Sequence, residues 1–262
     1  MASAAQTTHG GPPTEAELLE LLETLYNSSN PTRRWLHCTR RDWIIGQIRA
    51  HANRASGRAI EVGFGAGVYL PTLAECFSAV AATDLDQAHL DHAQPLLKRY
   101  PNLEAVADDI TSSHLPAGTF DFVLCSEVIE HIPGTPRVLA GIRKLLKPGG
   151  FLLLSTPQRY SLMEFACKVA FLPGVINIVR KIYNEPVFET GHINLSTAGG
   201  LQGLLGEAGF TIRERFKSGL YIPLLAEFGG QTGLHVAQWL ENRIRSGPLS
   251  FALWTQYYLA QV

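Results

Sequence analysis

Short apolar segments alternate with amphipathic stretches through the middle of the chain. The apolar segments, which we expect to form strands, are residues 59–62, 79–83, 103–107, 122–125 and 151–155. Between them, apolar residues recur three or four positions apart, which is the spacing of a helix with one buried face. The helices predicted in this way cover residues 68–77, 87–100 and 137–146. This alternation predicts an α/β fold, doubly wound, in which parallel strands are joined by crossover helices.

Proline and glycine residues set further boundaries. Pro95 lies inside the second predicted helix and is expected to kink it, because proline cannot donate a backbone hydrogen bond. Pro148-Gly149-Gly150 is expected to end the third helix. Beyond the fifth strand the alternation is interrupted by a long, apolar, helix-like insertion at residues 158–190. The remaining predicted elements are helices at 197–208 and 234–244 and strands at 211–216 and 251–259.

The N-terminal region differs from the alternating part. Residues 1–13 are small, polar and rich in glycine and proline, so we expect a disordered leader. Residues 14–56 are expected to form a helical extension with two helices, at 14–26 and 35–53. Residues 57–262 then form a single α/β domain, capped by the insertion.

Composition excludes several classes of protein. Charged residues make up 17% of the chain against about 25% in an average soluble domain. The net charge of −1 gives no broad positive field, so a nucleic-acid partner is not expected. The four cysteines contain no CxxC pair, which fits a reducing cytoplasm. The apolar stretch at 162–179 carries charges and a Pro-Gly pair, so stable membrane insertion is not expected either.

A glycine-rich turn is the strongest local motif. Glu61-Val62-Gly63-Phe64-Gly65-Ala66-Gly67 follows the first predicted strand, where glycines permit a tight turn and a close approach of the backbone to a ligand. Glu61 is placed to accept from a cationic amine. Nicotinamide enzymes use a glycine turn as well, but their GxGxxG spacing differs from the GxGxG spacing found here.

Polar residues follow the next predicted strands. Asp84 and Leu85 end the second strand, where a carboxylate can accept from two ribose hydroxyls. Asp109 and Ile110 follow the third strand and offer a carboxylate and an apolar side chain to an adenine ring; Asp108 and Asp109 are interchangeable in this role. The residues after the fourth strand are Ser126, Glu127 and His131. Because parallel strands end at one edge of the sheet, these groups should share a crevice.

Together these motifs, with the segment Phe120–Ile132 and Leu146-Lys147-Pro148-Gly149-Gly150, resemble the class I S-adenosylmethionine-dependent methyltransferases over about residues 55–215. The small-molecule enzymes of quinone biosynthesis are the most similar in character. The resemblance implies S-adenosylmethionine as cofactor and a seven-stranded sheet, mostly parallel with an antiparallel C-terminal strand. It gives the methionine part to Glu61, Gly63, Gly65 and Gly67, the ribose to Asp84 and the adenine to Asp109.

The same resemblance suggests an arginine for the cofactor carboxylate. The segment from Trp35 to Arg41 looks like the helix that precedes the core in such enzymes, and Arg41 is the candidate. A solvated basic helix face is an equal alternative for this arginine, because four arginines fall close together there.

Two histidines are candidates for a catalytic base. His192 lies just after the insertion and is favoured, whereas His131 is expected to face the cofactor; a purely structural role remains open for each. Tyr160, Phe165, Tyr183 and His192 are the candidate acceptor-binding residues. No group of Asp, Glu and His residues has convincing metal-ligand spacing in the sequence, so no metal site is predicted.

The insertion suggests the class of acceptor. Its apolar residues recur three and four apart, which would suit the wall of an apolar pocket, plain core packing or shallow contact with a membrane surface. We expect a small lipophilic acceptor, such as a polyketide, terpenoid or quinone of specialised metabolism. The alternatives are an NAD(P)-dependent oxidoreductase and a non-catalytic, cofactor-binding scaffold. Whether the protein forms a homodimer is left open.

Overall fold

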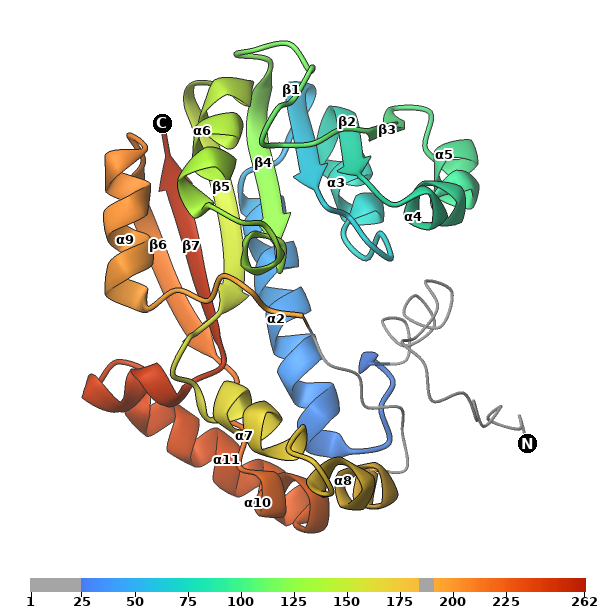
Figure 1. Ribbon diagram of the computed structural model, residues 1–262. Helices are drawn as coiled ribbons and strands as arrows, with labels where there is room; N and C mark the ends of the chain where they lie inside the picture. The colour runs from blue at the N-terminus through green and yellow to red at the C-terminus, as the bar shows by residue number, and fades with distance from the viewer. Residues whose placement is uncertain (1–24, 184–190) are drawn as a thin grey trace.

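The computed structural model describes residues 25–183 and 191–262, and it contains a sheet in the order β3-β2-β1-β4-β5-β7-β6 (Figure 1). The strands are β1 (Asn53–Val62), β2 (Phe77–Asp84), β3 (Leu103–Ala107), β4 (Phe120–Ser126), β5 (Leu146–Pro157), β6 (Thr211–Ser218) and β7 (Thr255–Gln261). Strand β7 is antiparallel to both its neighbours, and all other neighbouring pairs are parallel. Six strands therefore share one direction, which confirms the predicted doubly wound, mostly parallel sheet.

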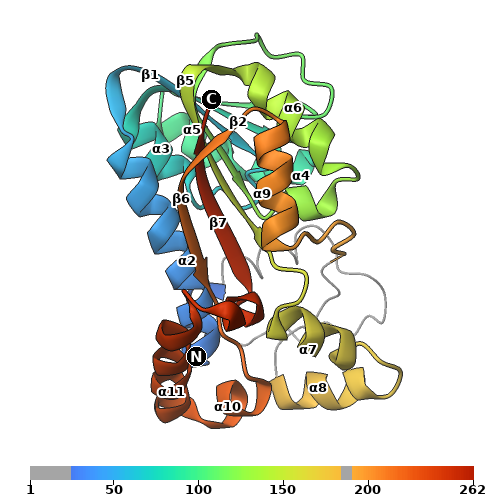
Figure 2. The same ribbon diagram turned by 90° about the vertical axis from the view of Figure 1, so that its left-hand side faces the viewer.

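Helices cover both faces of the sheet (Figure 2). One face carries α2 (Pro31–Ala50), α3 (Leu70–Cys76), α4 (Gln87–His92) and α5 (Gln94–Arg99). The other carries α6 (Thr135–Leu145) and α9 (Ala198–Glu207). The central strands β1, β4 and β5 contain runs of consecutive buried residues, as a sheet that is covered on both faces requires.

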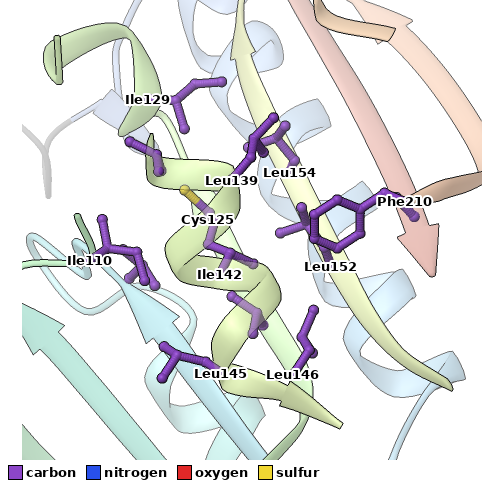
Figure 3. Packing of buried hydrophobic residues seen from close by; sticks show 14 of the residues in the cluster. Ile110, Cys125, Ile129, Leu139, Ile142, Leu145, Leu146, Leu152, Leu154 and Phe210 are labelled. Atoms are coloured by element: carbon purple, nitrogen blue, oxygen red, sulfur yellow. The ribbon is translucent and has the colours of Figure 1, made fainter. Parts of the chain in front are cut away.

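The core under α6 is tightly packed. Leu139 and Ile142 of this helix lie against Leu152 and Leu154 of β5, as Figure 3 shows, and all four are fully buried. Gly141 brings α6 close to the loop after β3: a Cβ at this position would lie 1.9 Å from the carbonyl oxygen of Ile110. A glycine is therefore required at this contact.

A third group of helices lies at one end of the molecule. It consists of α7 (Leu162–Ala170), α8 (Val175–Tyr183), α10 (Pro223–Phe228) and α11 (Gly230–Ile244). The arrowhead of β4 points toward this end, whereas that of β7 points away from it (Figure 1). The carboxyl ends of the parallel strands thus face these helices. Within the described ranges, no helix combines the length and the apolar character needed to cross a membrane.

Several boundaries differ from the sequence prediction. The expected kink at Pro95 is a break, because α4 ends at His92 and α5 starts with Pro95 in its first turn, where the missing N–H has no partner to lose. Strand β5 begins at Leu146, so Pro148-Gly149-Gly150 lies inside the strand. The last strand starts at Thr255 after a short 3-10 helix, Pro248–Ala252. The leader and most of the predicted helix at 14–26 lie outside the described residues.

Candidate active site

The glycine turn after β1 adopts a backbone that favours glycine. Gly63, Gly65 and Gly67 have φ values of 64°, 52° and 69°, in the left-handed region. A Cβ on Gly63 would also lie 2.7 Å from Cγ2 of Val128, which follows β4. The turn is therefore shaped by backbone conformation and by close contact with the neighbouring strand end.

Glu61 is buried at the end of β1 beside this turn. Its side-chain oxygen Oε2 is buried and has no hydrogen-bond partner among the described residues. Burial, and to a smaller degree the nearby Asp84 carboxylate, raises the pKa of Glu61 well above its ordinary value. A buried carboxyl without a partner is destabilising, and a cationic ligand would provide the missing interaction.

Asp84 ends β2 and faces the glycine turn. Its carboxylate accepts from the backbone N–H of Gly65 and of Asp86, each at 3.0 Å, and lies 3.0 Å from Nδ1 of His89. Burial by itself would raise the pKa of Asp84, but these hydrogen bonds outweigh it and lower the pKa. The next residue, Leu85, is 71% exposed and gives the site an apolar edge.

The two residues predicted after β3 lie in different surroundings. Asp109 is half-buried, and its Oδ1 accepts from the backbone N–H and the hydroxyl of Thr111, both at 2.8 Å. Asp108 accepts instead from the backbone N–H of His114. Ile110 is only 3% exposed and its side chain packs in the core under α6 (Figure 3), so it offers almost no surface to an adenine ring.

The end of β4 has an unusual backbone. Glu127 has a φ of 56°, which is uncommon for a residue other than glycine. Its Oε1 accepts from the hydroxyl of Ser155, which also lies 2.9 Å from the hydroxyl of Ser126. Its Oε2 lies 2.7 Å from Nη1 of Arg40 on α2. These contacts hold the side chains of the β4 end against the helix that precedes the core.

Arg40, and not Arg41, reaches this point of the site. Arg41 pairs with its neighbour Asp42 and lies over the ring of Tyr26. The helical phase of α2 explains the difference, because Leu36, Arg40 and Ile44 are buried at four-residue spacing. That spacing was visible in the sequence and could have selected Arg40.

Glu130, His131 and His192 come together beyond β4. One potential ligand atom from each residue lies within 4.8 Å of the others, and the two imidazole rings are 5.2 Å apart. The sequence predicts no metal site because Glu130-His131 and His192 are far apart along the chain. Two histidines and a glutamate are a set that zinc can use, so the fold assembles a group that spacing alone could not reveal.

The protonation of Glu130 bears on what this group can do. The carboxyl is fully buried, and its Oε2 accepts from the hydroxyl of Thr156 at 2.8 Å. Burial, and then the negative charge of Glu127, raises the pKa of Glu130 well above its ordinary value. A protonated carboxyl is a poor cation ligand. Burial, and then His192, lowers the pKa of His131, so its neutral form is favoured. In the cation-free group these shifts favour a protonated Glu130, whereas the neutral imidazole of His131 is also the form that binds a metal ion.

The remaining predicted acceptor residues lie on or next to α7 and α8, which together with α10 and α11 we call the cap helices. Phe165 on α7 is 66% exposed and lines an apolar hollow. Tyr160 is 64% exposed and borders a different hollow with Thr197 and Lys217. Tyr183 is the last residue of α8, and the position of its side chain lies outside what the structure describes.

The apolar hollow is formed by α2, α7, α8 and α10 and has a volume of about 550 Å³. Leu36, Met163, Ala166, Val175, Tyr221 and Leu224 are among the residues that line it. Its charged residues Arg33 and Glu227 form an ion pair with each other. Burial and the adjacent Arg40 lower the pKa of His37 to about 3, so this lining ring is uncharged. The hollow therefore suits an apolar ligand.

Sequence patterns did not indicate Glu164, which contacts a predicted catalytic residue. This residue of α7 is 5% exposed, and its Oε1 lies 3.1 Å from Nδ1 of His192. Nothing in the spacing of the sequence joins residues 164 and 192, because the contact forms only when α7 packs against the loop that carries His192.

The chain is similar in sequence to known methyltransferases. A family described as a methyltransferase domain matches residues 33–215. The ubiquinone biosynthesis O-methyltransferases of Burkholderia cenocepacia and Burkholderia vietnamiensis are 34% and 32% identical over 118 residues. Each of these matches covers 44% of this chain and 50% of the relative. The chain thus spans about half the length of the curated relatives it matches.

Solved structures show a similar fold at low identity. The [4+2]-cyclase SpnF has a TM-score of 0.59 at 16% identity, with 95% of this chain and 96% of that chain covered. A SAM-dependent methyltransferase from Aquifex aeolicus has a TM-score of 0.56 at 13% identity, with 95% and 98% covered. A geranyl diphosphate methyltransferase has a TM-score of 0.55 at 11% identity, with 87% and 78% covered.

Proposed function

Because the chain belongs to the class I S-adenosylmethionine-dependent methyltransferases, we propose that it transfers a methyl group from this cofactor to a small, lipophilic acceptor. S-adenosylmethionine is the cofactor of the family. The observation that carries the proposal is the buried, unpartnered Oε2 of Glu61 beside the glycine turn. A cationic amino group placed against it would remove the penalty of burying the carboxylate alone.

The residues at the strand ends fit the other parts of this cofactor. Asp84 has a lowered pKa and is ionised at neutral pH, so it can accept from ribose hydroxyls. Asp109 would serve the adenine amino group, and Arg40 would serve the carboxylate of the methionine part. Arg41, which the sequence suggested for binding the carboxylate of the methionine part, remains a second candidate, although it pairs with Asp42.

The proposed reaction does not require the protein to form a covalent bond with either substrate. The cofactor supplies an electrophilic methyl group on a sulfonium. The residues of the chain hold the acceptor atom in line with that methyl group and exclude water from the crevice. If the acceptor is a hydroxyl compound, His192 removes its proton, with His131 as the neighbouring alternative.

The hollow under the cap helices supports a lipophilic acceptor. It shares α7 with the residues around His192, since Met163 lines the hollow and Glu164 contacts His192. The names of two compared proteins refer to ubiquinone biosynthesis and to geranyl diphosphate, and both ubiquinone and the geranyl group contain an apolar isoprenoid chain. We propose a specialised metabolite or quinone-like acceptor in the cytoplasm. We also propose that the protein can form a homodimer. Every candidate site residue comes from one chain, so the proposed reaction does not depend on this dimer.

Calorimetry tests the cofactor. The chain should bind S-adenosylhomocysteine with heat and leave NADH unbound, whereas binding of NADH alone would support the oxidoreductase alternative. Incubation of the protein and S-adenosylmethionine with a lipophilic metabolite extract should then yield products heavier by one methylene. Cofactor binding without any methylated product from a broad panel would favour a scaffold.

A further inference from the structure

Glu164 is a buried acid with a defined partner outside the cofactor crevice. It lies in the first turn of α7, where its backbone N–H donates to the hydroxyl of Ser161 at 3.2 Å. Its side chain is buried, and its Oε1 lies 3.1 Å from Nδ1 of His192, which is itself 10% exposed. A buried carboxylate requires a hydrogen-bonding partner, and His192 is the partner found for Oε1.

The loop that carries His192 is fastened from the opposite side. The backbone N–H groups of Ile193 and Asn194 both donate to the carbonyl oxygen of Glu130 at 3.0 Å. The side-chain amide of Asn194 donates to the carbonyl oxygen of Ile132 at 3.1 Å and to the hydroxyl of Thr135 at 2.7 Å. The imidazole of His192 is thus held between the end of β4 and helix α7.

The Glu164 contact decides which nitrogen of His192 carries the hydrogen. A carboxylate oxygen accepts and does not donate, so this contact is a hydrogen bond when the ring carries its hydrogen on Nδ1. Nε2 is then left with its lone pair as the acceptor of the ring. This assignment of the tautomer follows from the hydrogen-bond partners.

We propose that Glu164 is a positioning residue that fixes His192 with Nε2 as the proton acceptor, and that the methyl acceptor is therefore a hydroxyl compound. This inference rests on the proposed function. As the acceptor oxygen bonds to the methyl carbon, the carbon–sulfur bond breaks and its electron pair stays on sulfur. The hydroxyl proton passes to Nε2, and the Glu164 carboxylate stabilises the resulting imidazolium. A neutral amine, which needs no base before the transfer, would not require this pair.

The tautomer can be measured without an acceptor. Nitrogen NMR of histidine-labelled protein with S-adenosylhomocysteine bound should show His192 protonated on Nδ1 and unprotonated on Nε2, with the signal assigned by its loss in His192→Gln. The Glu164→Gln variant should redistribute the two tautomers. A wild-type ring protonated on Nε2 would overturn the proposal.

A double-mutant cycle separates positioning from structure. With dodecylcatechol as acceptor, Glu164→Gln should lower kcat about 10- to 100-fold while the KM and the affinity for S-adenosylhomocysteine stay near normal. In a His192→Ala background the same change should have no further effect, because Glu164 acts through that ring. Independent effects that multiply in the double variant would mean that Glu164 serves only the fold.

Glu241→Gln is the matched control. Glu241 is also a fully buried acid, but its carboxylate accepts from the backbone N–H of Gly219 and Leu220 and from Nη2 of Arg245 and has no contact with His192. Its replacement should lower thermal stability, and its effect on kcat should be independent of His192.

Dodecylamine, compared with dodecylcatechol, distinguishes the inference from the function on which it depends. Methylation of the catechol supports both. Methylation of the amine alone would overturn the role of Glu164 and leave methyl transfer standing. Failure to bind S-adenosylhomocysteine would refute the proposed function. The tautomer of His192 could then still be measured in the cofactor-free protein, and this would test the role of Glu164 separately. Turnover that is lost with a chelator and restored by zinc would make His192 a metal ligand and would overturn the inference.

Discussion

Glu127 concentrates backbone strain and charge at one residue of the site. It is the only non-glycine residue with a positive φ among those the structure describes, and such a conformation is destabilising by about 1–3 kcal/mol. The ion pair with Arg40 and the hydrogen bond from Ser155 fix this conformation. The strained residue therefore lies where the fold presents its polar groups to the crevice.

Replacement of Arg40 tests this pair. Arg40→Ala should lower the free energy of unfolding by about 3 kcal/mol, the lower end of the range for breaking a buried pair. We choose the lower end because the two side chains retain 10% and 20% exposure. Arg41→Ala should change stability by less than about 0.5 kcal/mol. Urea denaturation measures both, and equal losses in the two variants would contradict the assignment of Arg40.

Loss of the Glu61 carboxylate should stabilise the cofactor-free protein at neutral pH but weaken the binding of the cofactor. Its folded-state pKa is raised by burial, so the folded chain holds this proton at a pH where the unfolded chain has lost it. The free energy of unfolding therefore falls as pH rises from the ordinary carboxyl pKa toward the folded one. Glu61→Gln should remove this dependence and stabilise the cofactor-free protein at neutral pH.

The same Glu61→Gln variant should bind S-adenosylhomocysteine at least tenfold more weakly, because an amide cannot balance the charge of an amino group. Thermal unfolding across the acidic to neutral range and calorimetry provide the two readings. Glu104→Gln, at an exposed position on β3, is the control and should change neither. A Glu61→Gln protein with normal affinity would remove Glu61 from the site.

At the scale of the elements, the sequence predicted the order and type of the strands well. Buried parallel strands are short and apolar, so their pattern is local and readable, and the acids at the ends of β1 and β2 could be placed with them. Boundaries that depend on pairing could not be read: β5 extends back through Pro148-Gly149-Gly150 because Leu146 pairs with Phe120 of β4. Helix α10 was missed because its six residues are too few for a periodic pattern.

The same limit applies to side chains that meet across elements. Arg40 and Glu164 were missed, since a contact between separate helices or loops leaves no spacing in the sequence. Helical phase was the one local signal, and it concerned Arg40 alone. The group of Glu130, His131 and His192 likewise required the path of the loop after the insertion.

The contact between α6 and the loop after β3 gives a prediction for a whole helix. Gly141→Ala should destabilise the protein by about 1–3 kcal/mol, because the new methyl group would overlap the carbonyl of Ile110 and the helix must shift. Gly203→Ala in α9 is the matched control. A Cβ at Gly203 has no atom within 4 Å, so this change should stabilise by about 0.5–1 kcal/mol. Chemical denaturation of both variants measures the difference, and equal effects would rule out the close contact.

At the scale of the whole molecule, exposed apolar side chains gather on the cap helices. Phe165, Leu224 and Phe228 are 66%, 75% and 68% exposed, and all three border the apolar hollow. Exposed apolar surface is thus prominent at the end of the molecule where the proposed acceptor binds.

A charge placed in the hollow should act on long acceptors only. Phe165→Asp should raise the KM for dodecylcatechol about tenfold, which corresponds to the loss of roughly two buried methylene groups, and should leave the KM for catechol unchanged. Leu249→Asp is the control, because Leu249 is 55% exposed but lies outside the hollow. Steady-state kinetics with both acceptors provides the test. An equal increase for catechol would mean that the hollow does not bind the chain of the acceptor.

The position of β7 inside the sheet has a consequence for the order of folding. Strand β6 joins the sheet only through β7, although β7 follows it by the length of two helices along the chain. Until residues 255–261 pair with both β5 and β6, β6 has no link to the sheet and β5 is left as an open edge. The sheet therefore cannot grow strand by strand from the N-terminal side. Its completion depends on a late, long-range pairing, and we expect this step to limit the folding rate.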